Sequence, residues 1–425
     1  MPPASALIPF EWPEQWKDAS LARLLEATPF NCILLPEQAP AGLAADLRRR
    51  FEVREALPWR KLAEIDWSRP GELVLIGDAV WPSVGEASGG DSTEAGPTGL
   101  PWLEANGWII RMARDLAPQA AVWIRSGPPE DAARMDAGLF VLAQCEAWAH
   151  GARRPVWLPP AVASGLAADN SAARAWWRRI VSVVEWWAQR ADRSAWPTLA
   201  RLLVISDFSG PNAYPATEFL NLAARRNLPW RAALPGKAGP ALAGMAAALY
   251  VDQEPPAGPL PGQLQDFVQR GGLLVCLPEA GRALRGLRAS SDTHPRFEIH
   301  ACGKGRAAFS RTGWEDPYLM ALDVHLLMSR RHDVVRLFNP GSILAWPALG
   351  LDRRRLLVHL LNYSRYGAAH DVAVQTWKPV KAAWVEQPGG QRRAAAVRRE
   401  AGGREVPLEP FEHYCAVELE GTQDA

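Results

Sequence analysis

The chain has 425 residues, of which 48% are hydrophobic and 22% are charged. This composition is typical of a folded protein of about two to four domains and excludes a mainly disordered chain. The 47 Lys and Arg residues balance 46 Asp and Glu residues, so the formal net charge is +1. Since nucleic acids and anionic membranes attract proteins with a basic surplus, neither is expected as the main partner.

The cysteine pattern and the first residues bear on the compartment. The cysteines are odd in number and contain no Cys-x-x-Cys pair, which argues against a disulfide framework and a zinc ribbon. Residues 1–17 have neither the basic nor the apolar region of a signal peptide. No apolar run reaches the roughly 18 residues that a membrane-spanning helix needs. We therefore expect a cytoplasmic protein, and the sequence indicates no metal or cofactor.

The region before residue 195 alternates between short apolar runs and segments with helical spacing. Buried strands of a parallel sheet read as such continuous runs, and the alternation predicts βα units. The runs that we interpret as strands are 31–36, 72–78, 120–125 and 154–159. Residues 83–99, rich in Gly, Ser and Thr, predict a loop after a strand end.

Residues 171–190 carry the clearest helical pattern of the chain. Trp176, Ile180, Val184 and Trp187 recur at spacings of three and four residues, which places them on one apolar face. Charged residues between them exclude a membrane span. We therefore predict a long amphipathic helix at the end of the first region.

The second region repeats a compact βαβαβ pattern. The segments 201–207, 248–252 and 272–278 read as strands, and 217–227 and 261–271 read as helices. Right-handed crossovers are expected between the strands. The region runs to about residue 335, and we predict an open, flavodoxin-like sheet.

The last region changes to short strand-like segments with turn residues between them and no helical spacing. These segments are 355–364, 371–377, 381–387 and 412–420. Such a pattern is typical of a small antiparallel β-sandwich. We thus predict a multidomain α/β protein with domains at 1–197, 198–338 and 339–425.

Two passages carry a resemblance to a known family. One is the stretch Glu146-Ala-Trp-Ala-His-Gly-Ala152 followed by PVWLP, and the other runs from RLLVISDFSGPN (201–212) through GGLLVCLP to LLVHLLNYS (356–364). Both are similar to passages of the bacterial β-galactosidases of glycoside hydrolase family 42. The order of the three regions also resembles that family.

The resemblance implies a catalytic (β/α)₈ barrel, a trimerisation domain with a glutamine-amidotransferase-like fold and a terminal sandwich. It further implies a carbohydrate as partner and a homotrimer as the assembly. A complete barrel takes about 250 residues, whereas the first region ends at residue 197. We therefore expect a truncated or degenerate barrel.

The chemistry departs from the family at both catalytic positions. Retaining glycosidases use two carboxyl groups about 5 Å apart. In the family the nucleophile ends the strand before the Ala-His-Gly-Ala helix, but that strand here ends at Ile124, Arg125 and Ser126. The family's acid/base follows an Asn, and this chain has no Asn-Glu pair. Neither role can be carried over, since Arg stays protonated.

Candidate site residues are therefore sought at strand ends and in loops. The candidates for catalytic carboxylates are Asp78, Glu104 and Glu130. The candidates for substrate binding are Trp81, Trp123, Arg125 and Trp157, since indole rings stack on sugars and the chain has 20 Trp. Each has a structural alternative: Asp78 as a turn cap, Arg125 as a salt-bridge partner and the tryptophans as core residues.

Further residues favour structural roles. Glu146 and His150 lie four apart on one predicted helix and fit an ordinary surface or packing pair better than a metal or acid/base site. Asp207 ends a strand and suits a turn. Cys276 lies inside a strand without the Gly-flanked elbow of an amidotransferase nucleophile. Lys304 lies in a Gly-Lys-Gly turn that is too short for a phosphate loop.

Two functions follow from these patterns. The first is a non-catalytic, glycosidase-like protein that binds carbohydrate or assembles into oligomers. The alternative is an active glycosidase with relocated carboxylates. The missing nucleophile favours the first function on mechanism.

Overall fold

A ring of parallel strand pairings forms the first part of the computed structural model, which describes residues 3–40, 42–84, 102–128, 136–329, 332–364, 367–400 and 402–421. The strands are β1 (Pro9–Glu11), β2 (Cys32–Leu35), β3 (Glu52–Glu55), β4 (Leu73–Ile76) and β7 (Ala121–Ile124). One sheet has the order β1-β2-β3, and β4 pairs with β7. Parallel bridges extend these pairings by joining Arg60 to Ile76, Trp123 to Arg153 and Val156 to Phe10, and the chain from β3 to Arg60 closes the arrangement without strand pairing. We call this arrangement the strand ring.

Alternate residues of the strands fill the interior of the strand ring. Leu7, Cys32, Leu34, Leu75 and Trp123 form one buried cluster there. Their neighbours in sequence face outward into the two large cores, as the period of two along a strand requires. The ring is thus a packed core and not an open channel.

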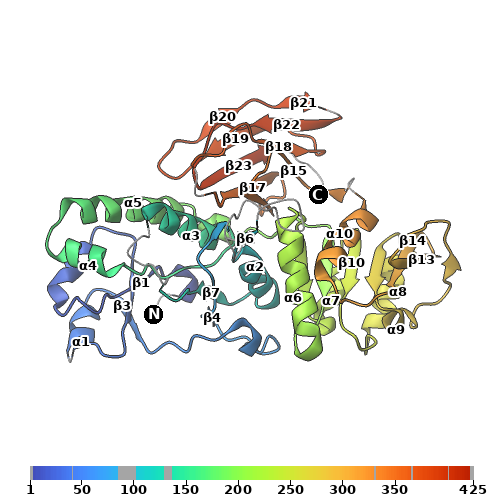
Figure 1. Cartoon of the computed structure of the whole chain (residues 1–425), viewed down its shortest axis with the longest axis horizontal. Helices are drawn as coiled ribbons and strands as arrows, with labels where there is room; N and C mark the ends of the chain where they lie inside the picture. The colour runs from blue at the N-terminus through green and yellow to red at the C-terminus, as the bar shows by residue number, and fades with distance from the viewer. Residues whose placement is uncertain are drawn as a thin grey trace, which may run out of the picture.

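Helices and short 3₁₀ turns surround the strand ring (Figure 1). The helices are α1 (Leu43–Leu47), α2 (Gly107–Leu116), α3 (Ala137–Ala149), α4 (Pro160–Ala167) and α5 (Ser171–Ala188), and the 3₁₀ turns are η1 (Ala4–Ala6), η2 (Ala19–Leu24), η3 (Leu62–Glu64) and η5 (Ala191–Ala195). Asn170 caps α5 by accepting hydrogen bonds from the backbone of Ala172 and Ala173. The predicted helix over 171–190 is confirmed, with Ile180 and Val184 fully buried.

A second sheet lies beside the ring, and α6 stands between the two (Figure 1). Its order is β12-β13-β14-β11-β10-β8-β9, with β9, β8, β10, β11 and β14 parallel. The strands are β8 (Leu202–Ile205), β9 (Trp230–Ala233), β10 (Ala247–Tyr250), β11 (Leu273–Cys276), β12 (Arg288–Ala289), β13 (Phe297–Cys302) and β14 (Gly305–Ser310). The helical elements are α6 (Gly210–Arg225), η6 (Pro235–Lys237), α7 (Ala238–Ala241), α8 (Leu260–Gln269), α9 (Pro278–Gly281) and α10 (Pro317–Met328).

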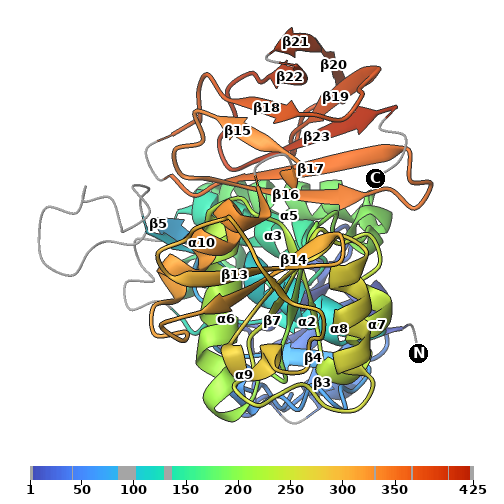
Figure 2. The same cartoon turned by 90° about the vertical axis from the view of Figure 1, so that its right-hand side faces the viewer.

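Two antiparallel sheets form the third part and lie across the other two (Figure 2). One contains β15 (Arg336–Phe338), β18 (Ala373–Thr376), β22 (Gly403–Pro407) and β21 (Arg398–Glu400). The other contains β16 (Ile343–Leu349), β17 (Arg355–Asn362), β23 (Tyr414–Glu420), β19 (Ala382–Glu386) and β20 (Arg393–Ala395). Apolar residues from both sheets share one buried cluster, which includes Val358, Val374 and Val406.

The architecture is that of a multidomain α/β protein with parallel and antiparallel sheets, as the sequence predicts. The domain limits 1–197, 198–338 and 339–425 stay predictions. β15 begins at residue 336, just before the third of these limits, and already pairs with β18. Among the described residues, no helix is long and apolar enough to cross a membrane.

Candidate functional site

The carboxyl ends of the ring strands open into a cleft of about 640 Å³, which we call the mouth cleft. Ligand sites of α/β proteins lie at this end of parallel strands. The volume is within the range of pockets that bind small molecules. The side chains and backbone that form the cleft come from 11–15, 34–38, 54–59, 125–128 and 157–160.

An ion pair joins two sides of the mouth cleft. Arg125, after β7, donates from Nε and Nη2 to the two carboxylate oxygens of Glu11, both at 2.9 Å. The Glu11 side chain is 12% exposed, whereas that of Arg125 is 45% exposed. Burial raises the pKa of Glu11, and the positive charge and hydrogen bonds of Arg125 oppose that rise. Both oxygens of this carboxylate are therefore engaged by one guanidinium.

Two indole rings line the same cleft as the ion pair. Trp59 lies 5.8 Å from the guanidinium carbon of Arg125, measured to the ring centroid. Trp157 is half-buried in the wall of the cleft and stacks on Phe140 at 6.3 Å between ring centroids. Aromatic faces beside a fixed polar pair are the elements that orient a sugar ring.

Further polar groups of the mouth cleft are exposed. Glu14, Glu37 and Gln38 line it and are open to solvent. Arg54 also lines it, and its buried Nε has no hydrogen-bond partner. The cleft therefore offers both acidic and basic groups to a ligand.

The predicted catalytic carboxylates do not come together in this cleft. Asp78 is exposed, and both its oxygens accept from the backbone N–H of Leu62 at 3.1 Å, at the start of η3 and not in the turn that follows its own strand. Glu104 of β6 (Leu103–Glu104) pairs with β5 (Ser83–Val84) and accepts from Trp102 Nε1. Glu130 lies outside the described residues. The catalytic roles of all three stay predictions.

The predicted binding residues divide into two groups. Arg125 and Trp157 line the mouth cleft. Trp81 instead donates from Nε1 to the Gly127 carbonyl and packs against Phe140. Trp123 has no exposed surface and lies in the interior of the strand ring. Sequence reasoning missed Glu11 and Trp59, and the acidic and aromatic spacing of FEWPEQW (10–16) was the signal for the first.

Glu146 and His150 are buried in the protein core. Glu146 accepts from the backbone N–H of Asn106 at 2.6 Å, from Asn106 Nδ2 at 2.7 Å and from the hydroxyl of Tyr363 at 2.7 Å. His150 Nδ1 accepts from Arg111 Nε at 3.3 Å. Burial, followed by the charge of Arg111, lowers the pKa of His150 well below its usual value. These contacts match the packing role predicted for both residues.

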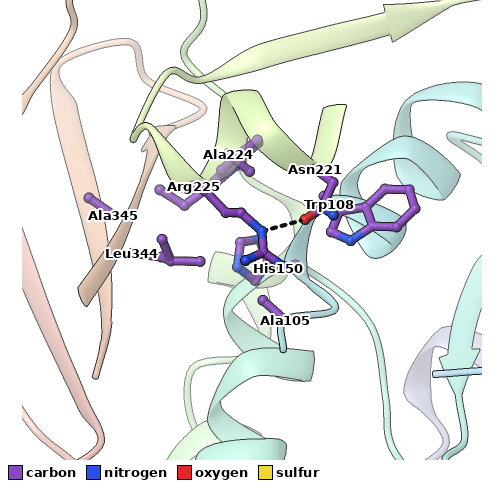
Figure 3. Close-up of a pocket in the computed structure, with 10 residues that line it drawn as sticks. Ala105, Trp108, His150, Asn221, Ala224, Arg225, Leu344 and Ala345 are labelled. Carbon is purple, nitrogen blue, oxygen red and sulfur yellow. Dashed lines mark hydrogen bonds between the residues drawn. The ribbon is translucent and has the colours of Figure 1, made fainter. Parts of the chain in front are cut away.

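A closed cavity of about 10 Å³ lies where the three parts of the molecule meet. Figure 3 shows His150 at the end of α3, Arg225 of α6 and Leu344 of β16 around it. Arg225 Nε donates to Asn221 Oδ1 at 3.0 Å. The cavity has room for about one water molecule, so it is too small for a sugar.

The remaining predicted residues also take structural positions. Asp207 Oδ1 accepts from the backbone N–H of Ser209 at 2.9 Å, which forms the expected turn. Cys276 is fully buried in β11, and burial raises the pKa of its thiol to about 12. Lys304 lies in the turn between β13 and β14. Within the described ranges, no group of three or more His, Cys, Asp and Glu residues is placed to hold a metal.

The strand ring, the open sheet and the two antiparallel sheets together form a multidomain α/β fold. No family model matches the chain, and no curated protein matches it. Among solved structures, it is similar to α-L-fucosidase isoenzyme 2 from Paenibacillus thiaminolyticus, with a TM-score of 0.57 and 11% identity. The match covers 95% of this chain and 79% of the fucosidase.

The chain is also similar to glycoside hydrolases of family 42. For a catalytic mutant of Gan42B, a β-galactosidase from G. stearothermophilus, the TM-score is 0.47 and the identity 12%, over 74% of this chain and 56% of that one. For the exo-carrageenase from Bacteroides ovatus, the values are 0.48 and 13%, over 89% and 54%. The resemblance inferred from the sequence is thus confirmed as a structural similarity at low identity.

Proposed function

We propose that this chain binds a carbohydrate in the mouth cleft without hydrolysing it. In this proposal the strand ring is a shortened (β/α) barrel, the second sheet is a flavodoxin-like domain of the glutamine-amidotransferase type, and the antiparallel sheets are a β-sandwich. The fold likeness to a fucosidase supports a sugar as ligand by analogy.

The observation that carries the proposal is the Glu11–Arg125 pair in one cleft with Trp59 and Trp157. A guanidinium and a carboxylate together offer donors and acceptors for sugar hydroxyls, and the indoles offer apolar faces for stacking. All four side chains line one cleft at the carboxyl end of the ring strands. That location is also where the sites of α/β barrels are built.

The same pair argues against hydrolysis. A glycosidase nucleophile needs a carboxylate oxygen free to attack the anomeric carbon. Both oxygens of Glu11 accept hydrogen bonds from Arg125. The strand end that holds the nucleophile in family 42 carries Arg125 itself. Binding is therefore the function that the cleft supports best.

Replacing Trp157 with alanine is expected to weaken oligosaccharide binding about tenfold, or about 1.4 kcal/mol, because a stacking face is lost. Titration calorimetry with a panel of neutral oligosaccharides measures the effect. Trp377→Ala is the matched control. Trp377 directly follows β18, is 42% exposed and does not line the cleft. Equal affinity of the Trp157→Ala and unmodified proteins contradicts the proposed site.

The alternative is an active glycosidase, and Glu14 and Glu37 favour it because they line the same cleft as Glu11. To test this alternative, hydrolysis of a panel of nitrophenyl glycosides by the unmodified protein is measured. Hydrolysis at background level is expected. Turnover that Glu11→Gln or Glu37→Gln abolishes would replace the binding proposal with a hydrolase that uses relocated carboxylates.

The resemblance to family 42 also supports a homotrimer as a proposal, and the cytoplasmic location expected from the sequence stays a separate proposal. Multi-angle light scattering on the full chain is expected to give three times the mass of one chain. A mass that stays at one chain across the accessible concentrations contradicts the trimer and leaves the cleft proposal unaffected.

A further inference from the structure

A second cavity, of about 360 Å³, lies at the amino end of the ring strands, opposite the mouth cleft. It begins beside Ala121, the first residue of β7, and reaches Ser5 and Ala6, which precede β1. The turn η5 forms another wall through Ala191, Ser194 and Ala195. We call it the amino-end cavity. Its volume fits a molecule of about monosaccharide size.

Two guanidinium groups line the amino-end cavity. Arg153 is 8% exposed, its guanidinium carbon lies 3.4 Å from the ring centroid of Trp148, and its Nη1 donates to the Ala152 carbonyl. Its buried Nε has no hydrogen-bond partner. Arg114 of α2 donates from Nη1 to the Ala120 carbonyl at 3.3 Å.

The positive charge in this cavity is not balanced by its walls. No Asp or Glu is among the residues that line it in the described part of the chain. Asp115, the next residue in the chain after Arg114, accepts from the backbone N–H of Ala232 and pairs with Arg231. Burial, followed by the charge of Arg114, lowers the pKa of Arg153 to about 9. An anion between the two would relieve both the burial cost and the repulsion.

A third donor belongs to the same cavity. Trp123 lines it, has no exposed surface, and its Nε1–H has no hydrogen-bond partner. An unpaired buried donor destabilises the folded protein, so proteins rarely keep one without a partner. Arg153 Nε and Trp123 Nε1 are thus unpaired, buried donors that belong to two residues lining one cationic cavity.

We propose that the amino-end cavity binds a small molecule carrying a phosphate or carboxylate group, which Arg114, Arg153 and the Trp123 indole hold. Charge-assisted hydrogen bonds from guanidinium to oxyanions are the strongest that such a site makes. The site is separate from the mouth cleft and does not depend on the function proposed there. The two cavities lie at opposite ends of the strand ring.

Titration calorimetry on the full chain tests the proposal with inorganic phosphate, glucose 6-phosphate, glucuronate and, as a neutral comparison, glucose. We expect at least one anion to bind at one site per chain and glucose to bind more weakly by tenfold or more. Comparing the dissociation constants of the phosphate compounds and of glucuronate shows which oxyanion the site prefers. Raising NaCl from about 0.05 M to about 0.5 M weakens the binding, since charges are screened.

Arg114→Gln is expected to raise the dissociation constant at least tenfold, and Arg114→Lys is expected to retain most of the affinity. Arg231→Gln is the matched control, because Arg231 pairs with the same Asp115 but does not line the cavity. Trp157→Ala, in the mouth cleft, should leave anion binding unchanged.

Trp123→Phe supplies a second variant if Arg114→Gln does not fold. It keeps an aromatic ring, removes the indole donor together with part of the ring volume, and is expected to weaken anion binding severalfold. The proposal is overturned if no anion binds below about 10 mM, or if glucose binds as tightly as the anions. It is also overturned if neither Arg114→Gln nor Trp123→Phe changes the affinity.

Discussion

Replacing Glu146 with alanine is expected to lower the free energy of unfolding by about 3–5 kcal/mol. The side chain is fully buried and accepts three hydrogen bonds, two from Asn106 and one from Tyr363. Alanine leaves these donors buried and unpaired, at about 1–3 kcal/mol each, and also opens a cavity. The lost hydrogen bonds include one between two parts of the molecule, because Glu146 lies in α3 and Tyr363 follows β17 of the antiparallel sheets.

Urea unfolding followed by tryptophan fluorescence and circular dichroism measures the effect. Tyr363→Phe is the graded control: it removes one of the three donors and should cost about 1–3 kcal/mol. Glu104→Ala, at a partly exposed carboxylate, is the matched control for losing a glutamate. If Glu146→Ala costs no more than Glu104→Ala, the buried hydrogen bonds are not what stabilises this junction.

The sequence predicted the strands whose burial is continuous. The runs at 31–36, 72–78 and 120–125 become β2, β4 and β7, because strands covered on both faces carry apolar residues throughout. β1 and β3 were missed, since PFE is short and EVRE is mostly charged. The run at 154–159 forms isolated bridges at Arg153 and Val156 instead of a regular strand.

The candidate site was predicted only in part, because its groups are far apart in sequence. Arg125 and Trp157 were found from their positions after strand-like runs, and both line the mouth cleft. Glu11 lies 114 residues before its partner Arg125, and no local pattern links the two. Asp78 shows the converse limit: a strand-end carboxylate reads the same whether it faces a ligand or, as here, accepts from the backbone of Leu62.

A second network joins η5 to the antiparallel sheets and centres on Arg193. Its Nη2 lies 3.0 Å from Glu386 Oε1 and 3.1 Å from Glu418 Oε2, and both carboxylates are 4% exposed. Arg190 adds a bond to Glu386 at 2.8 Å. Burial alone would raise the pKa of Glu386, but the hydrogen bonds and charges of Arg193 and Arg190 outweigh it and lower that pKa.

Arg193→Met is therefore expected to cost about 3–5 kcal/mol at neutral pH, because two buried carboxylates lose a shared partner. A carboxyl group with a depressed folded pKa contributes stability above its unfolded pKa of about 4.3, and that contribution is lost as the pH falls through the folded value. The difference between the variant and the unmodified protein should accordingly shrink below about pH 4.

Urea unfolding at a series of pH values measures this dependence. Arg393→Ala is the control, since Arg393 pairs with Glu409 at the surface, where the side chains are 55% and 67% exposed. An exposed pair is worth about 0–1 kcal/mol, so this variant should change stability little at any pH. If the cost of Arg193→Met stays constant from neutral to acidic pH, the packing of the Arg193 side chain, and not its paired charge, holds η5 to the sheets.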